Sequence, residues 1–286
     1  MVRPNLILVE GLPGSGKSTT AQLVQEILND RSIHSHLILE GNLDHPADYD
    51  GVACFHKEEY AEMLNALEHS FRALINERTT RIGDNCFLEY RKLFDELGSS
   101  VPDALRQACA VRDIYELSLD QNRQLIVDRW KQFVECAVHG SDVYVFECCF
   151  IQNPVTIGMI KYDAETEDVI SYVLELASAA EKLNPLLIYV EQNDLDYSFR
   201  KAVDERPRQW SEGFIDYYTN QGYGKLQGHS GLEGTIQVLK ARSELEQIIF
   251  NRLPIAKVKI NNSSFDRDQY KRALKGIITE RMSAGQ

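Results

Sequence analysis

The residues with the clearest chemical meaning lie near the amino terminus, between Gly11 and Ser18. This stretch has glycines at its first, fourth and sixth positions, followed directly by a lysine and a serine. Glycines allow successive backbone N–H groups to converge on phosphate oxygens, because no Cβ atom obstructs the approach. Lys17 would place a positive charge against the terminal phosphates of a nucleotide, and Ser18 would offer a hydroxyl to Mg²⁺. The spacing therefore predicts a phosphate-binding loop.

Such a loop has to be held by a strand that enters it and a helix that leaves it. Residues 6–9 form an apolar run that predicts a buried strand, and residues 21–28 carry apolar side chains on one helical face. The amino terminus of that helix would add the positive end of its dipole to the phosphate site. The alternative is a fortuitous glycine-rich turn, which the flanking strand and helix argue against.

Short apolar runs alternate with helical patterns along much of the chain, which predicts a parallel sheet covered by helices. Further strands are expected at 36–39, 143–146, 186–190 and 256–260. Helices are expected at 166–183, 196–206, 235–252 and 265–281. Glycines between residues 213 and 234 predict loops there.

The segment 41–140 has a different character, because its periodicity is mostly helical. A strong apolar face extends from Tyr60 to Ile75, Pro102 suits the first turn of another helix, and Asp120 suits the cap of a third. We therefore expect a single α/β domain over residues 1–286, interrupted by a helical insert over 41–140.

Composition and charge exclude several classes of protein. The chain has 31 basic and 43 acidic side chains, a net charge of −12, which argues against a nucleic acid as partner because such binding begins with neutralised phosphates. No apolar run reaches the roughly 18 residues of a membrane helix, so no membrane partner is expected. The first residues are too short an apolar stretch for a signal peptide, and the six cysteines match no CxxC signature. A reducing cytoplasm is the expected location.

The stretch from Val9 to Thr19 resembles the opening of the P-loop kinases of the nucleoside and nucleoside-monophosphate kinase group, which carry this Walker A motif. The resemblance covers the sheet elements well and residues 41–140 poorly. It implies a five-stranded parallel sheet with strand order 2-3-1-4-5 and helices on both faces. It also implies ATP and Mg²⁺ as cofactors, with the nucleotide held by Gly11, Leu12, Pro13, Gly14, Ser15, Gly16, Lys17, Ser18 and Thr19.

Glu147, at the end of the strand 143–146, carries a weaker part of the resemblance. In these kinases an acidic residue at this position acts as base for the acceptor hydroxyl or holds Mg²⁺ through water. The metal would thus be held by Ser18 and Glu147. The arginine that often follows in the group is replaced here by Cys148, which puts the usual substrate contact in doubt. The alternative is a surface glutamate at a strand end.

Residues 195–209 resemble the arginine-bearing helix and lid of the same kinases, and a lid-like segment would extend over 196–234. Arg200, Arg206 and Arg208 are the catalytic candidates, because an arginine fork meets the charge that spreads over the transferred phosphoryl group. An amphipathic surface helix with ordinary ion pairs is the alternative. Asn261 lies in the loop after the last strand, which in the group passes the adenine base.

These residues predict an ATP-dependent phosphotransferase whose acceptor is a hydroxyl or phosphate of a small molecule, with nucleosides or nucleotides as the first choice. Two alternatives stay open: a nucleotide-dependent regulatory ATPase or switch, and an ATP-binding module without transfer activity. The long span from Lys17 to Glu147 argues against a plain adenylate or thymidylate kinase. If Glu147 is not the catalytic carboxylate, Glu40 and Asp44 are the next candidates. The sequence leaves open the acceptor, the choice between ATP and GTP, and a homodimer.

Overall fold

The computed structural model describes residues 3–264 and 266–283. The chain forms two compact units. The main unit consists of Met1–Glu40 and Trp130–Gln286, and the insert unit of Gly41–Arg129. Each unit has a sheet and a hydrophobic core of its own.

The main unit is built on a five-stranded sheet in which every neighbouring pair is parallel. Its strands are β1 (Leu6–Gly11), β2 (Ser35–Ile38), β6 (Val143–Glu147), β7 (Leu186–Glu191) and β8 (Ala256–Asn261). They lie in the order β2-β6-β1-β7-β8. When these five strands are numbered in chain order, the arrangement is 2-3-1-4-5, as expected.

The register of the sheet brings the predicted phosphate loop and the predicted carboxylate to the same edge. Val9 of β1 is paired with Glu147 of β6, and Gly11 of β1 with Val190 of β7. Because all strands run in one direction, their carboxyl ends meet at this edge, where ligands of open α/β sheets bind.

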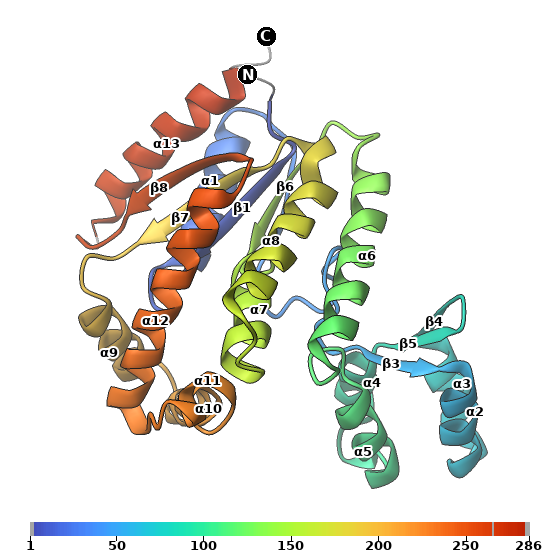
Figure 1. The fold of residues 1–286 in the computed structure, drawn as a ribbon. Coiled ribbons are helices and arrows are strands. Elements are labelled where there is room, and N and C mark those ends of the chain that lie inside the picture. Colours follow the sequence, from blue (N-terminus) through green and yellow to red (C-terminus); the bar gives the residue numbers. More distant parts are fainter. Residues whose placement is uncertain (1–2, 265, 284–286) are drawn as a thin grey trace. The chain divides into compact units, whose positions relative to one another are not determined.

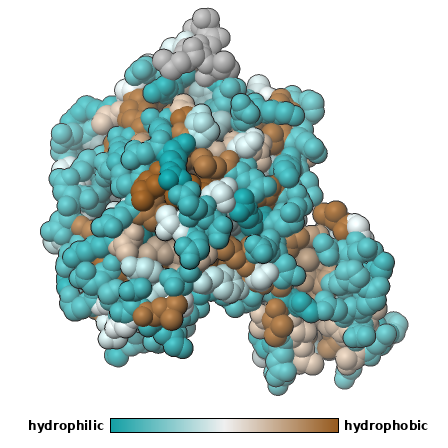
Figure 2. Space-filling view, viewed as in Figure 1, coloured by the Kyte–Doolittle hydropathy of each residue, from teal (hydrophilic) through white to brown (hydrophobic). Residues whose placement is uncertain are grey.

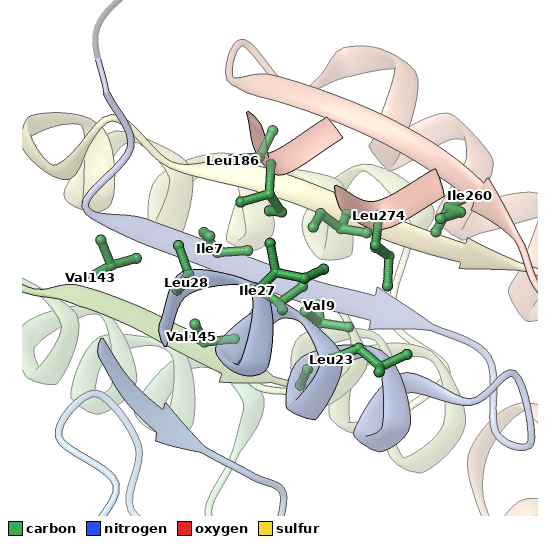
Figure 3. Close-up of a cluster of buried hydrophobic side chains, with 14 of the residues drawn as sticks. Ile7, Val9, Leu23, Ile27, Leu28, Val143, Val145, Leu186, Ile260 and Leu274 are labelled. Carbon is green, nitrogen blue, oxygen red and sulfur yellow. The ribbon is translucent and has the colours of Figure 1, made fainter. Parts of the chain in front are cut away.

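Helices cover both faces of the main sheet (Figure 1). One face carries α1 (Lys17–Asp30) and α13 (Arg267–Ser283), and the other carries α8 (Thr166–Ala180) and α12 (Gly231–Arg252). Figure 3 shows the core between the sheet and the first pair, where apolar side chains of β1, β6 and β7 meet those of the two helices. Burying each such side chain contributes about 1.5–3 kcal/mol, so this core holds the helix that leaves the phosphate loop.

The helix expected at 196–206 is present as α9 (Leu195–Glu205). The stretch that follows is helical where loops are expected, because it contains α10 (Arg208–Thr219) and α11 (Gly222–Leu226) before α12 begins. The loop prediction over 213–234 is therefore wrong. A glycine inside a helix costs about 1 kcal/mol, which packing overrides here because Trp210, Phe214 and Tyr218 recur at helical spacing and pack together.

Shorter helical segments join the strands elsewhere in the main unit. After β6 come α7 (Gln152–Val155) and a π-helical segment, η2 (Thr156–Lys161). A short 3₁₀ helix, η3 (Glu181–Leu183), follows α8. The helix α6 (Leu119–Ala137) includes the boundary between the two units.

The insert unit has helices and also a small antiparallel sheet, so the expectation of a helical insert is incomplete. Its helices are α2 (Lys57–Ala66), α3 (His69–Glu77), α4 (Tyr90–Leu97), η1 (Gly98–Ser100) and α5 (Asp103–Arg112). Its strands β3 (Ala53–His56), β4 (Thr79–Ile82) and β5 (Asn85–Leu88) lie in the order β3-β5-β4. Each strand has four residues, which is too few for a clear alternating pattern in the sequence.

Among the residues that the structure describes, no helix has the length and apolar character needed to cross a membrane. Figure 2 shows hydrophilic side chains over most of the visible face, with apolar side chains in small separate groups.

Candidate active site

The predicted phosphate loop has a backbone that requires glycine. Gly14 and Gly16 have φ angles of 84° and 94°, in the left-handed region that other residues rarely adopt. A Cβ atom on Gly11 would lie 2.5 Å from the carbonyl oxygen of Val190, and one on Gly16 would lie 2.5 Å from the side-chain amide of Asn262. The loop is therefore closely packed against β7 and the segment after β8, with no room for a side chain at Gly11 or Gly16.

Lys17 begins α1 and turns back into this loop, where its Nζ donates a hydrogen bond to the carbonyl oxygen of Leu12 at 3.1 Å. The side chain is only 7% exposed. Burial alone would lower the pKa of Lys17, but the negative charges of the nearby Glu40 and Glu147 act in the opposite direction, and the pKa is raised. Lys17 therefore carries its positive charge inside the loop, which suits the binding of an anion.

Ser18 and Glu147 form the contact that links the loop to β6. The Ser18 hydroxyl donates a hydrogen bond to Glu147 Oε1 at 2.6 Å, and the backbone N–H of Glu40 donates to Glu147 Oε2 at 3.3 Å. A hydroxyl and a carboxylate side by side are the oxygen donors that Mg²⁺ prefers. These two residues therefore fit the predicted cation, which they would hold together with phosphate oxygens.

Glu40 extends the same polar group. Its carboxylate accepts hydrogen bonds from Gln152 Nε2 at 2.6 Å and from the Cys148 thiol at 3.4 Å. Cys148 has a φ of 71° and burial raises the pKa of its thiol well above the usual value, so the thiol remains a donor. Glu40, Cys148 and Glu147 each place one ligand atom within 4.8 Å of the others.

Glu10 fixes the backbone that follows β6. Its carboxylate is buried and accepts backbone hydrogen bonds from Phe150 and Ile151 at 2.8 and 3.0 Å, and from Gln152 at 3.0 Å. Burial raises the pKa of Glu10 to about 7, although the three backbone hydrogen bonds lower it in part. The residue just before the predicted phosphate loop thus holds the backbone at the start of α7, including that of Gln152.

A cavity of about 790 Å³ opens over these groups. Its lining comes from the loop and α1, from the ends of β6 and α7, from α9 and α10, and from the segment after β8. The polar and charged residues around it include Lys17, Ser18, Glu40, Glu147, Gln152, Asn153, Thr156, Lys201, Glu205, Arg206, Gln209, Asn262 and Arg267.

One wall of the cavity is aromatic. The guanidinium of Arg206 lies 4.1 Å from the ring centre of Trp210, whose ring is 5.2 Å from that of Phe214. Phe214 in turn stacks on Tyr218 at 4.1 Å. Trp210, Phe214 and Tyr218 all line the cavity, so α10 presents aromatic side chains to it.

A buried ionic network contacts this aromatic wall through the Tyr218 hydroxyl. Arg242 is fully buried and its Nε donates to Glu246 Oε1 at 2.6 Å, while the Tyr189 hydroxyl donates to Glu246 Oε2 at 2.7 Å. Arg242 also donates to Thr156 Oγ1 at 3.0 Å and to the Tyr218 hydroxyl. The network therefore fixes two residues of the cavity lining, Thr156 and Tyr218. In the sequence, Arg242 and Glu246 look like any i, i+4 ion pair on a helix surface, so the sequence does not indicate that they are buried.

The three predicted arginines have different surroundings. Arg206 lines the cavity. Arg200 instead hydrogen-bonds Glu233 at 2.6 and 2.8 Å and also Asp196, and Arg208 is 89% exposed and bonds Glu212 at 2.7 Å. Among the described residues, Arg200 and Arg208 are both outside the cavity lining. The lining does contain two other cationic side chains, Lys201 and Arg267.

The predicted Asn261 is one residue away from the asparagine that contacts the loop. Asn262 donates from Nδ2 to the carbonyl oxygen of Ser15 at 3.0 Å and lines the large cavity. Asn261 bonds Asn193 at 2.6 Å and lines a separate cavity of about 220 Å³. Successive side chains in extended backbone point to opposite sides, which is the reason for the one-residue difference.

Asp44, a further candidate from the sequence, belongs to the insert unit, and so does its neighbour His45. Lys92 donates a hydrogen bond to Asp44 Oδ1 at 2.6 Å. His45 is buried, and burial together with the charge of Arg129 lowers its pKa to about 3. Asp44 therefore has a local ion pair, and His45 is neutral.

No protein-family model matches the chain, and no curated protein matches it.

Proposed function

We propose that this protein is an ATP- and Mg²⁺-dependent phosphotransferase for a small-molecule acceptor, built like the P-loop kinases of the nucleoside and nucleoside-monophosphate kinase group. The observation that carries the proposal is the 2.6 Å hydrogen bond from the Ser18 hydroxyl to Glu147, next to the glycine loop and at the border of the 790 Å³ cavity. A phosphate loop, an oxygen donor pair and room for an acceptor thus occur together.

The nucleotide phosphates would be held by the loop. The backbone N–H groups of the loop and the amino terminus of α1 would give a positive potential at the phosphates, and Lys17 would add a full positive charge. To bind them, Lys17 Nζ must exchange its hydrogen bond with Leu12 for phosphate oxygens. Mg²⁺, when bound, neutralises phosphate charge, and Ser18 and Glu147 are the residues that would hold it.

The acceptor would lie in the remainder of the cavity. A volume of about 790 Å³ is within the range of small-molecule sites and exceeds what phosphates alone would need. Glu147 and Glu40 offer carboxylates that can accept a proton from an acceptor hydroxyl, and Gln152 and Asn153 offer amides for orientation. Arg206, and also Lys201 and Arg267, provide cations for the charge that develops on the transferred group. An acceptor pocket of this kind favours a kinase over an ATPase that transfers to water.

We further propose that the protein is located in the cytoplasm. ATP and reduced thiols occur together in the cytoplasm, and all six cysteines of the chain are free and five of them buried.

The test is ADP release from ATP and Mg²⁺, measured with and without a panel of nucleosides, nucleotides and other hydroxyl compounds. We expect release that depends on one acceptor class. Glu147→Gln keeps the shape of the side chain but removes its charge, so turnover should fall by about 10²–10⁴-fold while ATP still binds. Lys17→Ala should weaken ATP binding and turnover together.

Each contrary result has a defined meaning. ADP release that no acceptor stimulates would replace the kinase proposal with the regulatory ATPase. ATP binding without any turnover would leave a binding module. If Lys17→Ala binds ATP as tightly as the parent and has the same thermal stability, the phosphate-loop assignment itself is wrong.

A further inference from the structure

A second group of side chains of the types that can bind a metal lies at the opposite end of β6 from Glu147. It consists of His34, His36 and Asp142, whose ligand atoms are all within 4.8 Å of one another. His34 Nδ1 is 3.1 Å and His36 Nε2 is 2.8 Å from the same carboxylate oxygen, Asp142 Oδ2. Both imidazole nitrogens thus approach the same carboxylate oxygen.

The backbone brings these side chains together. In the sheet His36 of β2 is paired with Tyr144 of β6, and the N–H of Val143 donates to the carbonyl oxygen of His34 at 3.1 Å. Residues two apart on extended backbone point to the same side, so both imidazoles face the residue that precedes β6. The imidazole of His36 also stacks on the ring of Tyr144, with ring centres 5.0 Å apart and an angle of 25° between the ring planes. This stacking helps to orient the imidazole. The cluster is therefore set by strand pairing as well as by side-chain hydrogen bonds.

We propose that His34, His36 and Asp142 form a binding site for a divalent transition-metal ion, with Zn²⁺ as the representative. Two imidazole nitrogens and a carboxylate oxygen are a donor set that Zn²⁺ accepts, at bond lengths of about 2.0–2.2 Å. Tetrahedral ligands at that bond length are about 3.3 Å apart, close to the observed 2.8 and 3.1 Å. A small outward movement of the rings would therefore admit the ion. Mg²⁺ and Ca²⁺ prefer oxygen donors and fit this set poorly.

The site is open to solvent and separate from the proposed catalytic site. The side chains of His34, His36 and Asp142 are 73%, 42% and 35% exposed, so water can complete the coordination. Asp142 and Glu147 flank opposite ends of one strand, five residues and about 16 Å apart along it. A bound ion would join the four-residue edge strand β2 to β6, which predicts a stabilising role.

The proposal is tested by isothermal titration of the metal-free full chain with ZnCl₂, in excess Mg²⁺ to saturate oxygen sites. The variants are His34→Gln with His36→Gln, and separately Asp142→Asn. The matched control is His69→Gln, an exposed histidine at the start of α3. We expect the parent and the control to bind one more Zn²⁺ than the double variant. Asp142→Asn should weaken that site by at least about tenfold, because even outer-shell changes cost 10–100-fold in affinity.

A second readout is independent of stoichiometry. Co²⁺ in place of Zn²⁺ should give visible absorption bands in the parent and the control that are absent from the double variant. Circular dichroism of each metal-free variant should match the parent, which separates lost binding from lost folding. Equal Zn²⁺ binding by the parent and a folded double variant would overturn the proposal, and so would a parent that binds no Zn²⁺ at all.

Discussion

Lys17, Ser18, Glu40 and Glu147 share one feature: each is satisfied by another member of the site or by the loop. Ser18 donates to Glu147, Glu40 receives a hydrogen bond from Gln152, and Lys17 donates to Leu12. Of these four, Lys17 and Glu147 are the buried charges, and a buried charge is costly unless it is paired and hydrogen-bonded, so this arrangement stabilises the site without a ligand. A ligand has to replace these contacts with better ones, which favours one that carries several charges.

Arg206 and Arg208 allow a direct comparison between an arginine that lines the cavity and one that does not. Arg206→Ala should lower kcat by about 10²–10³-fold, the usual cost of removing one donor to developing charge, and should change ATP affinity little. Arg208→Ala is the matched control, because Arg208 is 89% exposed and pairs with Glu212 outside the cavity. The measurement is steady-state kinetics with the acceptor class that stimulates ADP release in the panel.

If both variants keep full activity, the lid is not part of the catalytic machinery. If Arg208→Ala is the more damaging of the two, the lid acts in a different conformation from the one described.

Among the helices, α11 depends on close approach of two backbones. A Cβ atom on Gly224 would lie 2.0 Å from the carbonyl oxygen of Tyr218, and one on Gly222 would lie 2.2 Å from that of Ile160. The two glycines therefore let α11 lie against the end of α10 and against η2. Both neighbours supply residues to the cavity, Tyr218 from α10 and Thr156 from η2, so these glycines help to shape it.

Gly224→Ala should reduce the free energy of unfolding by about 1–3 kcal/mol, the usual cost of overpacking a close contact. Gly276→Ala is the control within α13, where an added Cβ atom meets nothing within 4 Å. That substitution should instead stabilise the protein by about 0.5–1 kcal/mol, because alanine loses less backbone entropy in a helix. Urea denaturation measures both, and the same sign for both substitutions would contradict the packing described for α11.

In the molecule as a whole, each of the two units has a hydrophobic core of its own, and the main unit also buries ionisable groups. Glu10, Arg242 and Glu246 are at most 1% exposed. The negative charge of Glu246 adds to the effect of burial on Glu10. Removing one partner from such a network leaves an uncompensated charge, so the network ties the stability of the main unit to pH.

Glu10 gives that dependence a definite sign. Its pKa is about 7 in the folded protein against 4.5 when exposed, so the folded state binds more protons between these pH values. The contribution of Glu10 to stability is therefore fully present below pH 4.5 and decreases as the pH rises through about 7. The total change is about 3 kcal/mol, at 1.36 kcal/mol for each pKa unit.

Glu10→Gln removes this titration. Denaturant unfolding of parent and variant from pH 4 to pH 8 should show the parent losing stability relative to the variant as the pH increases. A constant difference across the range, or one of the opposite sign, would show that Glu10 titrates as an exposed carboxylate does.

The glycine loop, the strands of the main sheet and the edge at which the loop and Glu147 meet could all be predicted from the sequence. These features follow from local spacing and periodicity, together with the rule that parallel strands end at one edge. The helices over 208–226 and the strands of the insert unit were not readable in this way. In the first case aromatic packing overrode the glycines, and in the second the strands were too short to show a pattern.

Which polar side chains share the cavity could be learned only from the folded chain. Ser18 and Glu147 are 129 residues apart, and Glu10 binds backbone 140 residues away. The choice of Arg206 over Arg200, and of Asn262 over Asn261, depends on which way each side chain points once helix and sheet are packed. The same holds for His34, His36 and Asp142, because strand pairing between β2 and β6 brings the two histidines near the aspartate. Contacts between distant segments have no local signature, since many side chains of the same types occur elsewhere along the chain.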